Sequence, residues 1–310
     1  MKKTVKRLFA LVLAALFVAV TFSGDAFAAK KKKSYYSWSE AKYYEYRDGQ
    51  WVISNEDSYS FYKNGSTKSY AYCFYDYDYE TKENKKGPEY KYVYSDKKKK
   101  STTKNYIDGK YTGKTVTTWT SKKSTSKTYD EKGKLVSSQV DTLDKHRNTV
   151  KSVEKRDNKT YTTKHKNTYK KGRLVKVVTT YSDGTKATVT YSHYSNGDIK
   201  KYTYKSKYDS SSYTYDKQRR LTKYSYSNDY NESVSTYEYK GKKPHAVKMT
   251  EKIRYRQDNS TETNTYTYKR KYDKKNNLTE EITYKNGEEA YKSVYSGFKK
   301  FTYTVDGSKK

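Results

Sequence analysis

The sequence predicts an all-β protein in which antiparallel β-hairpins stack side by side into an extended, twisted or partly closed sheet. Three observations favour this fold: hairpin-type turns recur, tyrosines alternate with polar residues at period two, and a short tyrosine motif returns four times. After residue 29 the sequence shows no sustained apolar pattern at helical spacing, whereas Thr, Tyr and Val are abundant, which favours strands.

Residues 1–28 have the pattern of a cleaved secretory signal peptide. Basic residues precede an apolar run from Leu8 to Phe22, and the small residues Ala26 and Ala28 suit a signal peptidase that cuts before Ala29. The run is short for a membrane span, and the sequence predicts no transmembrane anchor. We therefore expect a secreted or extracellular protein, held at the cell surface, if at all, by its charge.

The composition of the chain after residue 28 is strongly basic and poor in aliphatic residues. It contains 63 Lys and Arg against 34 Asp and Glu, a formal net charge of +29, which attracts polyanions. Leu, Ile, Val and Phe together make up 29 of 282 residues, a level typical of disordered chains. Disorder is the alternative interpretation, but all 41 tyrosines lie after the signal segment, and a tyrosine ring can be buried while its hydroxyl stays in water.

The predicted strands are separated by turn signals. Asn-Gly and Asp-Gly favour type I′ hairpin turns, because both residues tolerate positive φ. Alternation such as Tyr202-Thr203-Tyr204 places tyrosine on one strand face and Thr, Ser, Lys or Glu on the other. In SYAYCFYDYDYE the alternation changes phase, which predicts a bulge near Phe74. The glycines preceded by Asp or Asn are Gly49, Gly65, Gly109, Gly184, Gly197, Gly287 and Gly307.

Composition divides the chain into four segments. Residues 1–28 are the signal peptide, and residues 29–96 form a Tyr-rich β region. Residues 97–105 form a Lys-rich loop or linker, and residues 106–310 form a hairpin-repeat region. Each repeat cannot bury its tyrosine face alone, so the units are expected to stack in register.

The repeat region carries the motifs YDEKGKLV from Tyr129, YKKGRLV from Tyr169, YDKQRRLTK from Tyr215 and YDKKNNLTE from Tyr272. These motifs resemble YD repeats, the RHS-type repeats of bacterial polymorphic toxins and teneurins, and more weakly the repeats of MORN-like proteins. The family pattern is a Tyr-Asp pair, two variable residues, Gly, a basic residue and Leu. The first motif matches this pattern in full, the second lacks one residue, and the last two place Arg219 and Asn276 where Gly is expected.

The resemblance implies a β-hairpin repeat architecture and a surface-related extracellular role. It does not imply toxin delivery, because the chain has few units and the sequence shows neither the family's Asp-Pro plug motif nor an effector region after the repeats. We expect the leucine after each turn to act as an aliphatic plug. These leucines are Leu135, Leu174, Leu221 and Leu278.

Two lysine clusters and three tryptophans are the candidate binding residues. The lysines would hold polyanions, with the first cluster as a solvated basic arm, and the tryptophans would serve as aromatic platforms for sugars or bases, although most aromatic rings are needed for the core. The lysine clusters are Lys30, Lys31, Lys32, Lys33 and Lys97, Lys98, Lys99, Lys100, and the tryptophans are Trp38, Trp51 and Trp119.

The sequence offers little for catalysis, and we predict a protein that is not an enzyme and uses no cofactor or metal. Asp76, Asp78 and Glu80 alternate with tyrosines and could hold calcium, but pairing with lysines on a neighbouring strand is the favoured interpretation. The lone cysteine, Cys73, is expected to be buried and inert. The four histidines show no zinc-type spacing.

The sequence therefore predicts a secreted, non-enzymatic β-repeat protein that binds anionic cell-envelope or matrix polymers through a basic, tyrosine-rich surface. The first alternative is an extracellular nucleic-acid-binding protein, and carbohydrate is a further candidate partner. A third hypothesis, a glycosidase that uses Asp76 or Glu80, is disfavoured because such enzymes need two carboxylates at a defined separation.

Overall fold

A computed structural model describes residues 31–305 of the chain, with side chains described for residues 34–302. The described residues divide into a large unit, Tyr35–Phe301, and a small one, residues 31–34 with 302–305. The strands β1 (Lys31–Ser37) and β22 (Lys299–Val305) pair as a separate two-stranded sheet, and within the small unit the Ser34 and Thr302 hydroxyls lie 3.2 Å apart. The predicted signal peptide, residues 1–28, lies outside the described residues.

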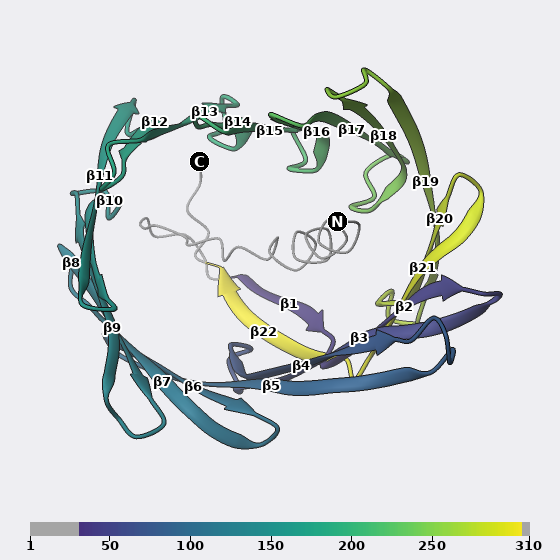
Figure 1. Cartoon of the computed structure of the whole chain (residues 1–310), viewed down its shortest axis with the longest axis horizontal. Coiled ribbons are helices and arrows are strands. Elements are labelled where there is room, and N and C mark those ends of the chain that lie inside the picture. Colours follow the sequence, from purple (N-terminus) through teal and green to yellow (C-terminus); the bar gives the residue numbers. More distant parts are fainter. Residues whose placement is uncertain (1–30, 306–310) are drawn as a thin grey trace. The chain divides into compact units, whose positions relative to one another are not determined.

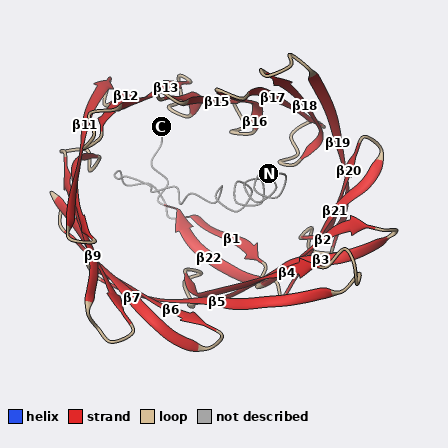
Figure 2. Ribbon diagram, viewed as in Figure 1, coloured by secondary structure: helices blue, strands red, loops and turns tan. Residues whose placement is uncertain are grey.

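The larger unit is a closed barrel of twenty antiparallel strands, β2 to β21 (Figures 1 and 2). Each strand pairs with the next in sequence, and β2 pairs with β21 to close the ring. The predicted all-β hairpin fold is confirmed, and the sheet is closed rather than extended or partly closed. The strands are β2 (Glu40–Arg47), β3 (Gln50–Phe61), β4 (Thr67–Tyr77), β5 (Asn84–Lys97), β6 (Lys100–Ile107), β7 (Lys110–Trp119), β8 (Lys123–Asp130), β9 (Leu135–Leu143), β10 (Thr149–Arg156), β11 (Lys159–Lys170), β12 (Arg173–Thr180), β13 (Lys186–His193), β14 (Ile199–Lys205), β15 (Asp209–Tyr215), β16 (Leu221–Asn228), β17 (Asn231–Tyr239), β18 (Ala246–Tyr255), β19 (Thr261–Tyr272), β20 (Leu278–Lys285) and β21 (Glu288–Ser296).

Five hairpins turn through two consecutive residues with positive φ, the geometry of a type I′ turn. The predicted type I′ turns are confirmed at Gly49, Gly109 and Gly287, where the preceding residues have φ between 48° and 53°. The right-handed twist of this turn matches that of the strands it joins. The five turns are Asp48–Gly49, Asp108–Gly109, Asp157–Asn158, Lys171–Gly172 and Asn286–Gly287.

Three of the other predicted type I′ turns, at Gly65, Gly184 and Gly197, have a different construction. Only the glycine has positive φ, and the preceding Asn or Asp uses its side chain to accept a backbone N–H two residues later, for example Ser66 N to Asn64 Oδ1 at 3.0 Å. The loop is longer, with Tyr62 N donating to Ser66 O at 2.8 Å. The type I′ prediction is therefore wrong for these three, and Gly307 lies outside the described residues.

The Tyr-Asp motifs use this longer turn, and the aspartate caps it. In the turn at Asp216, the Asp216 N donates to Arg220 O at 2.9 Å, and the carboxylate accepts the Gln218 and Arg220 N–H groups at 2.8 and 3.0 Å. Such caps satisfy backbone donors that a tight turn leaves unpaired. Asp130, Asp144 and Asp273 accept turn N–H groups in the same way.

The position three residues after this aspartate requires positive φ, which explains the glycine of the motif and its substitutes. Here φ is 82° at Gly133, 65° at Arg219 and 63° at Asn276. The His146-Arg147 turn, which the sequence analysis did not include among the motifs, has the same geometry, with φ of 66° at Arg147. A side chain with a Cβ atom is strained in this conformation.

The leucines of the motifs lie opposite the tyrosines of the same motifs. Tyr129 pairs with Leu135 across its turn, and the other three motifs repeat this pairing. The prediction that the leucines are buried plugs is wrong: Leu135 is 48% exposed, and the other three are half-buried. Each leucine lies at the turn end of its own hairpin, where part of its side chain stays in water.

Replacing Arg147 with glycine is expected to stabilise the protein. Glycine adopts φ of 66° without the strain that a Cβ atom brings, and the gain should be about 0.5–1 kcal/mol in the free energy of unfolding. Gly133→Arg should lower the free energy of unfolding by a similar amount, through backbone strain alone. A Cβ atom at Gly133 would meet no atom within 4 Å, so no steric clash adds to that cost. Denaturant titration measures both, and an Arg147→Gly variant less stable than the parent protein would contradict the strain argument.

One face of the barrel, here called the tyrosine face, carries ladders of tyrosine rings. Tyr191, Tyr202, Tyr213 and Tyr224 are paired in register on β13 to β16, with successive ring centroids 5.5, 5.6 and 4.8 Å apart. Such cross-strand pairs stabilise a sheet by a few tenths of a kcal/mol each. A second ladder crosses β3, β4 and β5. Its residues are Tyr59, Tyr70, Tyr72, Tyr90 and Tyr92.

The opposite face carries the predicted Lys–Glu pairs, such as Lys42 with Glu56 at 3.2 Å and Lys271 with Glu280 at 2.7 Å. The tyrosines of the two ladders are half-buried, and no large side chain among residues 34–302 is fully buried. The register shift between Cys73 and Tyr75 confirms the predicted bulge near Phe74. The barrel therefore depends on its closed backbone ladder and on ring ladders, with few aliphatic contacts.

Candidate functional site

The turns of the barrel form two rims of opposite charge. Because successive strands are antiparallel, alternate turns lie at the same end of the ring. The nine turns that follow β3, β5 and every second strand to β19 form the basic rim, with fifteen Lys and Arg and four Asp, a net charge of +11 within residues 35–301. Its basic residues are Lys63, Lys98, Lys99, Lys122, Lys145, Arg147, Lys171, Lys217, Arg219, Arg220, Lys240, Lys242, Lys243, Lys274 and Lys275.

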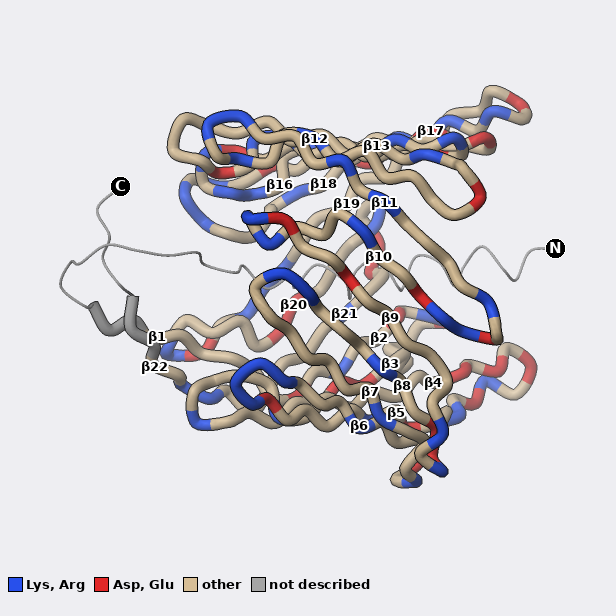
Figure 3. Tube along the Cα trace, turned by 90° about the vertical axis from the view of Figure 1, so that its left-hand side faces the viewer, with Lys and Arg blue, Asp and Glu red and all other residues tan. Residues whose placement is uncertain are grey.

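The ten turns at the other end form the acidic rim, which follows β2 and every second strand to β20. In residues 35–301 these turns contain ten Asp and Glu and five Lys and Arg, a net charge of −5. Figure 3 shows the turns on the left of the barrel dominated by Lys and Arg, while those on the right carry acidic tips. In a chain of such high positive charge, this separation concentrates the attraction for polyanions at one end.

The acidic residues of the basic rim are held by contacts within the turns. Asp144, Asp216 and Asp273 cap their turns, and Asp198 pairs with Arg219 at 2.7 Å. Hydrogen bonds from the turn backbone lower the pKa of Asp273. In contrast, fourteen of the fifteen basic side chains on this rim are exposed, the half-buried one being Arg220.

Arginines brace the basic rim. The Arg220 guanidinium donates to the carbonyls of Gly241 and Lys243 in the next turn, at 2.6 and 3.0 Å, and lies over the Tyr239 ring at 4.3 Å. Arg173 donates to the carbonyls of Tyr194 and Ser195 in the same manner. These contacts fix neighbouring turns relative to each other. Sequence analysis missed this role, although an arginine at a strand start after a turn is a visible signal.

The second predicted lysine cluster lies on the basic rim. Lys98 and Lys99 form the exposed turn between β5 and β6, and Lys97 and Lys100 are the flanking strand residues. Residues 97–105, predicted as a loop or linker, thus belong to one hairpin of the barrel. In the first cluster, predicted as a solvated basic arm, Lys31, Lys32 and Lys33 belong to strand β1, and Lys30 lies outside the described residues.

The three tryptophans are half-buried and do not form one platform. Trp38 packs edge-on against Tyr59 at 5.0 Å, and the Lys292 ammonium covers the Trp51 ring at 4.7 Å. Trp119 ends β7 on the basic rim, where its backbone N–H donates to Lys99 O at 3.2 Å. Trp119 is therefore the one of the three that lies at the basic rim.

The carboxylates considered for calcium do not share a strand face. β4 ends at Tyr77, so Asp78 and Glu80 lie in the following turn, where Asp78 accepts the Glu80 N–H at 2.9 Å. Asp78 also lies 4.0 Å from Lys85 Nζ on the neighbouring strand, which fits the favoured interpretation of lysine pairing. Among residues 34–302 no group of three His, Cys, Asp or Glu side chains is arranged to hold a metal ion.

Cys73 is 3% exposed, as expected, and burial raises the pKa of its thiol. Among the histidines, His165 Nδ1 lies 3.0 Å from Thr179 Oγ1, and His146 stacks on Tyr169 at 4.2 Å. Burial lowers the pKa of His165 and of His193. Each of these groups has a packing or turn role in its own hairpin.

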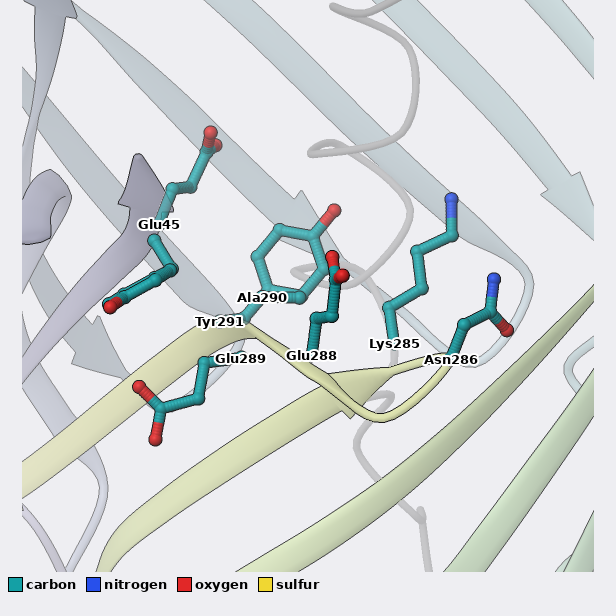
Figure 4. Close-up of a pocket in the computed structure, with 8 residues that line it drawn as sticks. Glu45, Lys285, Asn286, Glu288, Glu289, Ala290 and Tyr291 are labelled. Atoms are coloured by element: carbon teal, nitrogen blue, oxygen red, sulfur yellow. The ribbon is translucent and has the colours of Figure 1, made fainter. Parts of the chain in front are cut away.

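An open hollow of about 400 Å³ lies on the acidic rim. It is lined by the end of β2, by the turn after β20 and by the start of β21. Figure 4 shows Glu45, Lys285, Glu288 and Tyr291 on one side of the sheet, with Glu289 turned the other way. Glu45 is paired with Arg47. The hollow is therefore acidic overall, with its charges partly compensated within the sheet.

On β18, Glu251 is buried in a row of polar residues, paired with Ser235 and Asn264 and only 8% exposed. Burial raises the pKa of Glu251, so its ionised form costs stability at neutral pH. Glu251→Gln should raise the free energy of unfolding by about 1 kcal/mol at pH 7. The difference should vanish below about pH 4, where the glutamate is protonated in both the folded and the unfolded state.

Thermal melts from pH 3 to 8 measure this effect. Glu262→Gln serves as a control, because hydrogen bonds from Asn264 and Tyr255 lower the pKa of Glu262. The ionised form of Glu262 therefore stabilises the fold, and the pH dependence of stability at this residue has the opposite sign to that at Glu251. A Glu251→Gln variant that is less stable than the parent protein at pH 7 would contradict the assigned cost of the buried charge.

Within the described residues 31–305 no helix is long and apolar enough to cross a membrane. No protein-family model matches the chain. No curated protein matches it either.

Several solved structures resemble the chain weakly. A porin-like protein from Bacteroides uniformis aligns with a TM-score of 0.38 and 14% identity over 84% of this chain and 97% of that chain. A porin-like protein from Bacteroides vulgatus gives a TM-score of 0.31 and 9% identity over 82% and 96%. The complex TcdB2-TccC3-Cdc42 gives a TM-score of 0.31 and 11% identity over 74% of this chain and 14% of that chain.

Proposed function

We propose that this protein is a secreted, non-enzymatic β-repeat protein that binds anionic polymers of the cell envelope or matrix through its basic rim. The observation that carries the proposal is the net charge of +11 in the nine turns of that rim, against −5 at the other end. A uniformly basic barrel would attract polyanions to all of its surface, whereas this charge distribution favours one end.

The spacing of the turns supports binding to a chain-like ligand. Neighbouring turns of one rim lie two strands apart, about 10 Å. The Debye length at physiological ionic strength is about 8 Å, so the fields of adjacent turns overlap. The densest part covers three successive turns, at 216–220, 240–245 and 273–277, which together carry eight of the fifteen basic residues. A flexible polymer with regularly spaced phosphates or carboxylates can contact several of these turns at once.

The resemblance of the Tyr-Asp motifs to YD repeats remains part of this proposal. Turns with the same aspartate cap and the same positive-φ position recur along β8 to β20, which supports a common origin of the hairpins. Three of these four turns, at Asp144, Asp216 and Asp273, lie on the basic rim, and multivalent contact with several basic turns raises affinity without any strong single site.

Single-stranded nucleic acid is the second candidate ligand. The position of Trp119 at the basic rim favours it, because an aromatic ring beside lysines can stack on a base while the ammonium groups hold phosphates. Tyr272, which is 43% exposed next to the turn at 273–277, adds a second ring on that rim.

Competition binding separates the two candidates. The mature protein is bound to purified teichoic acid and challenged with a single-stranded oligonucleotide, and the reverse experiment is also done. Displacement of the oligonucleotide by the wall polymer at equal charge concentration supports the proposal, and the opposite order favours nucleic acid. Binding to either that persists in 1 M salt would overturn an electrostatic mechanism, because phosphate contacts weaken steeply with salt.

A further inference from the structure

The acidic rim contains a second hollow, which differs in chemistry from the first. It has a volume of about 370 Å³ and lies between two neighbouring turns, after β12 and after β14. We call it the tyrosine hollow, and its residues include Tyr181, Lys186, Tyr204, Lys207, Tyr208 and Asp209. It combines aromatic rings with two lysines on a rim that is otherwise acidic.

Two of its rings are exposed. Tyr208 is 60% exposed and Tyr181 is 40% exposed, whereas the tyrosines of the β13–β16 ladder are half-buried. The Lys207 ammonium lies 5.6 Å from the centre of the Tyr208 ring. Exposed aromatic surface of this kind typically marks a binding site, because leaving it in water costs free energy that a ligand can recover.

Side-chain hydrogen bonds order the backbone of the two turns that form the hollow. Ser206 Oγ accepts the N–H groups of Tyr208 and Asp209, both at 3.1 Å, and Ser206 in turn donates to Asp209. On the other side, Asp183 Oδ1 accepts the Thr185 N–H at 2.9 Å. The backbone that carries the exposed rings therefore has hydrogen-bonded turn geometry before any ligand binds, which lowers the entropy cost of binding.

The chemistry of the hollow selects a class of ligand. A tyrosine ring packs against the C–H face of a pyranose ring, and phenol and Thr185 hydroxyl groups offer hydrogen bonds to sugar hydroxyls. Lys186 and Lys207 supply positive charge for an anionic substituent. We propose that the tyrosine hollow binds a hexuronate, a sugar ring that carries a carboxylate. This site lies on the opposite rim from the proposed polyanion surface and does not depend on it.

The test is a titration of the mature protein with a hexuronate disaccharide, followed by NMR of backbone amides. The matched ligand is the neutral hexose disaccharide with the same linkage. We expect the uronate to shift the amides of residues 181–186 and 206–209 and to bind about threefold to fivefold more tightly than the neutral sugar, since an ion-pair contact at an exposed site is worth up to about that factor.

Three variants decide whether the hollow is the site. Tyr208→Ala and Lys207→Gln should each weaken uronate binding about twofold to fivefold, since each removes one of the contacts proposed at an exposed site. Tyr230→Ala is the matched control: Tyr230 is 79% exposed in the next turn of the same rim and does not line the hollow, so its loss should change nothing.

The proposal is overturned if the uronate shifts only amides of the basic rim, if it shifts none, or if Tyr208→Ala binds as well as the parent protein. Replacing Lys240, Lys242, Lys243 and Lys274 with glutamine distinguishes this from the proposed function. That variant should lose polymer binding and keep uronate binding in the hollow. Loss of both would mean that charge alone holds the sugar.

Discussion

Replacing Lys240, Lys242, Lys243 and Lys274 with glutamine is expected to reduce affinity for purified teichoic acid at least about 100-fold at physiological salt. These lysines are exposed in two successive turns of the densest part of the basic rim. A lysine near an anionic surface contributes about 1 kcal/mol, and four of them act on the same polymer. The slope of log affinity against log salt should also become less steep by about 3, because fewer counterions are released.

The control variant removes the same charge from the barrel wall. Lys151, Lys164, Lys176 and Lys201 are exposed strand residues, and their replacement with glutamine should weaken binding less than about fivefold. Isothermal titration at several salt concentrations measures both variants. Equal losses in the two variants would show that total charge, and not the position of charge on the rim, governs binding.

Introducing a carboxylate at Ala41 is expected to open the seam of the barrel. Ala41 is 1% exposed, and it is paired with Tyr295 of β21 on one side and with Asp57 of β3 on the other. Burial raises the pKa of Asp57, which shows that an ionised carboxylate beside Ala41 already lowers the free energy of unfolding. Ala41→Asp should lower the free energy of unfolding by about 3–5 kcal/mol, through an unpaired buried charge beside a like charge.

A loss of that size corresponds to a melting temperature lower by roughly 10 °C in a chain of this length. Ala41→Ser is the control, because it changes the volume little and adds no charge, and it should cost about 1 kcal/mol or less. Thermal melts followed by circular dichroism measure both. An Ala41→Asp variant within 1 kcal/mol of the parent protein would mean that the β2–β21 pairing does not hold the ring closed.

The local structure of this chain could be predicted from its sequence because turn chemistry acts over four or five residues. Asp-Gly and Asn-Gly predict hairpins correctly, and the phase change at Phe74 predicts the observed bulge. The turn type at Gly65 was wrong, since the Asn64 side chain offers an alternative hydrogen bond that periodicity does not reveal. The strained Arg147 position was also missed, because no glycine marks it.

Closure and the two rims could not be predicted in the same way. Whether β2 reaches β21 depends on the accumulated twist of twenty strands and on contacts about 250 residues apart, such as Ser296 Oγ to Glu40 Oε2 at 2.9 Å. Lys97–Lys100 was identified as a charge cluster, but its membership of a rim with Lys242 or Lys274 follows only from strand alternation in the assembled barrel. The tyrosine hollow likewise joins turns that lie about 25 residues apart.

Amide hydrogen exchange in β2 tests the closed barrel most directly. In an antiparallel strand alternate N–H groups point to opposite neighbours, so in residues 40–46 one set donates to β3 and the other to β21. The closed ring predicts that both sets exchange slowly and at similar rates in the mature protein. If every second amide of β2 exchanges as fast as in a short peptide while its neighbours remain protected, the sheet is open, and its turns do not form two continuous rims.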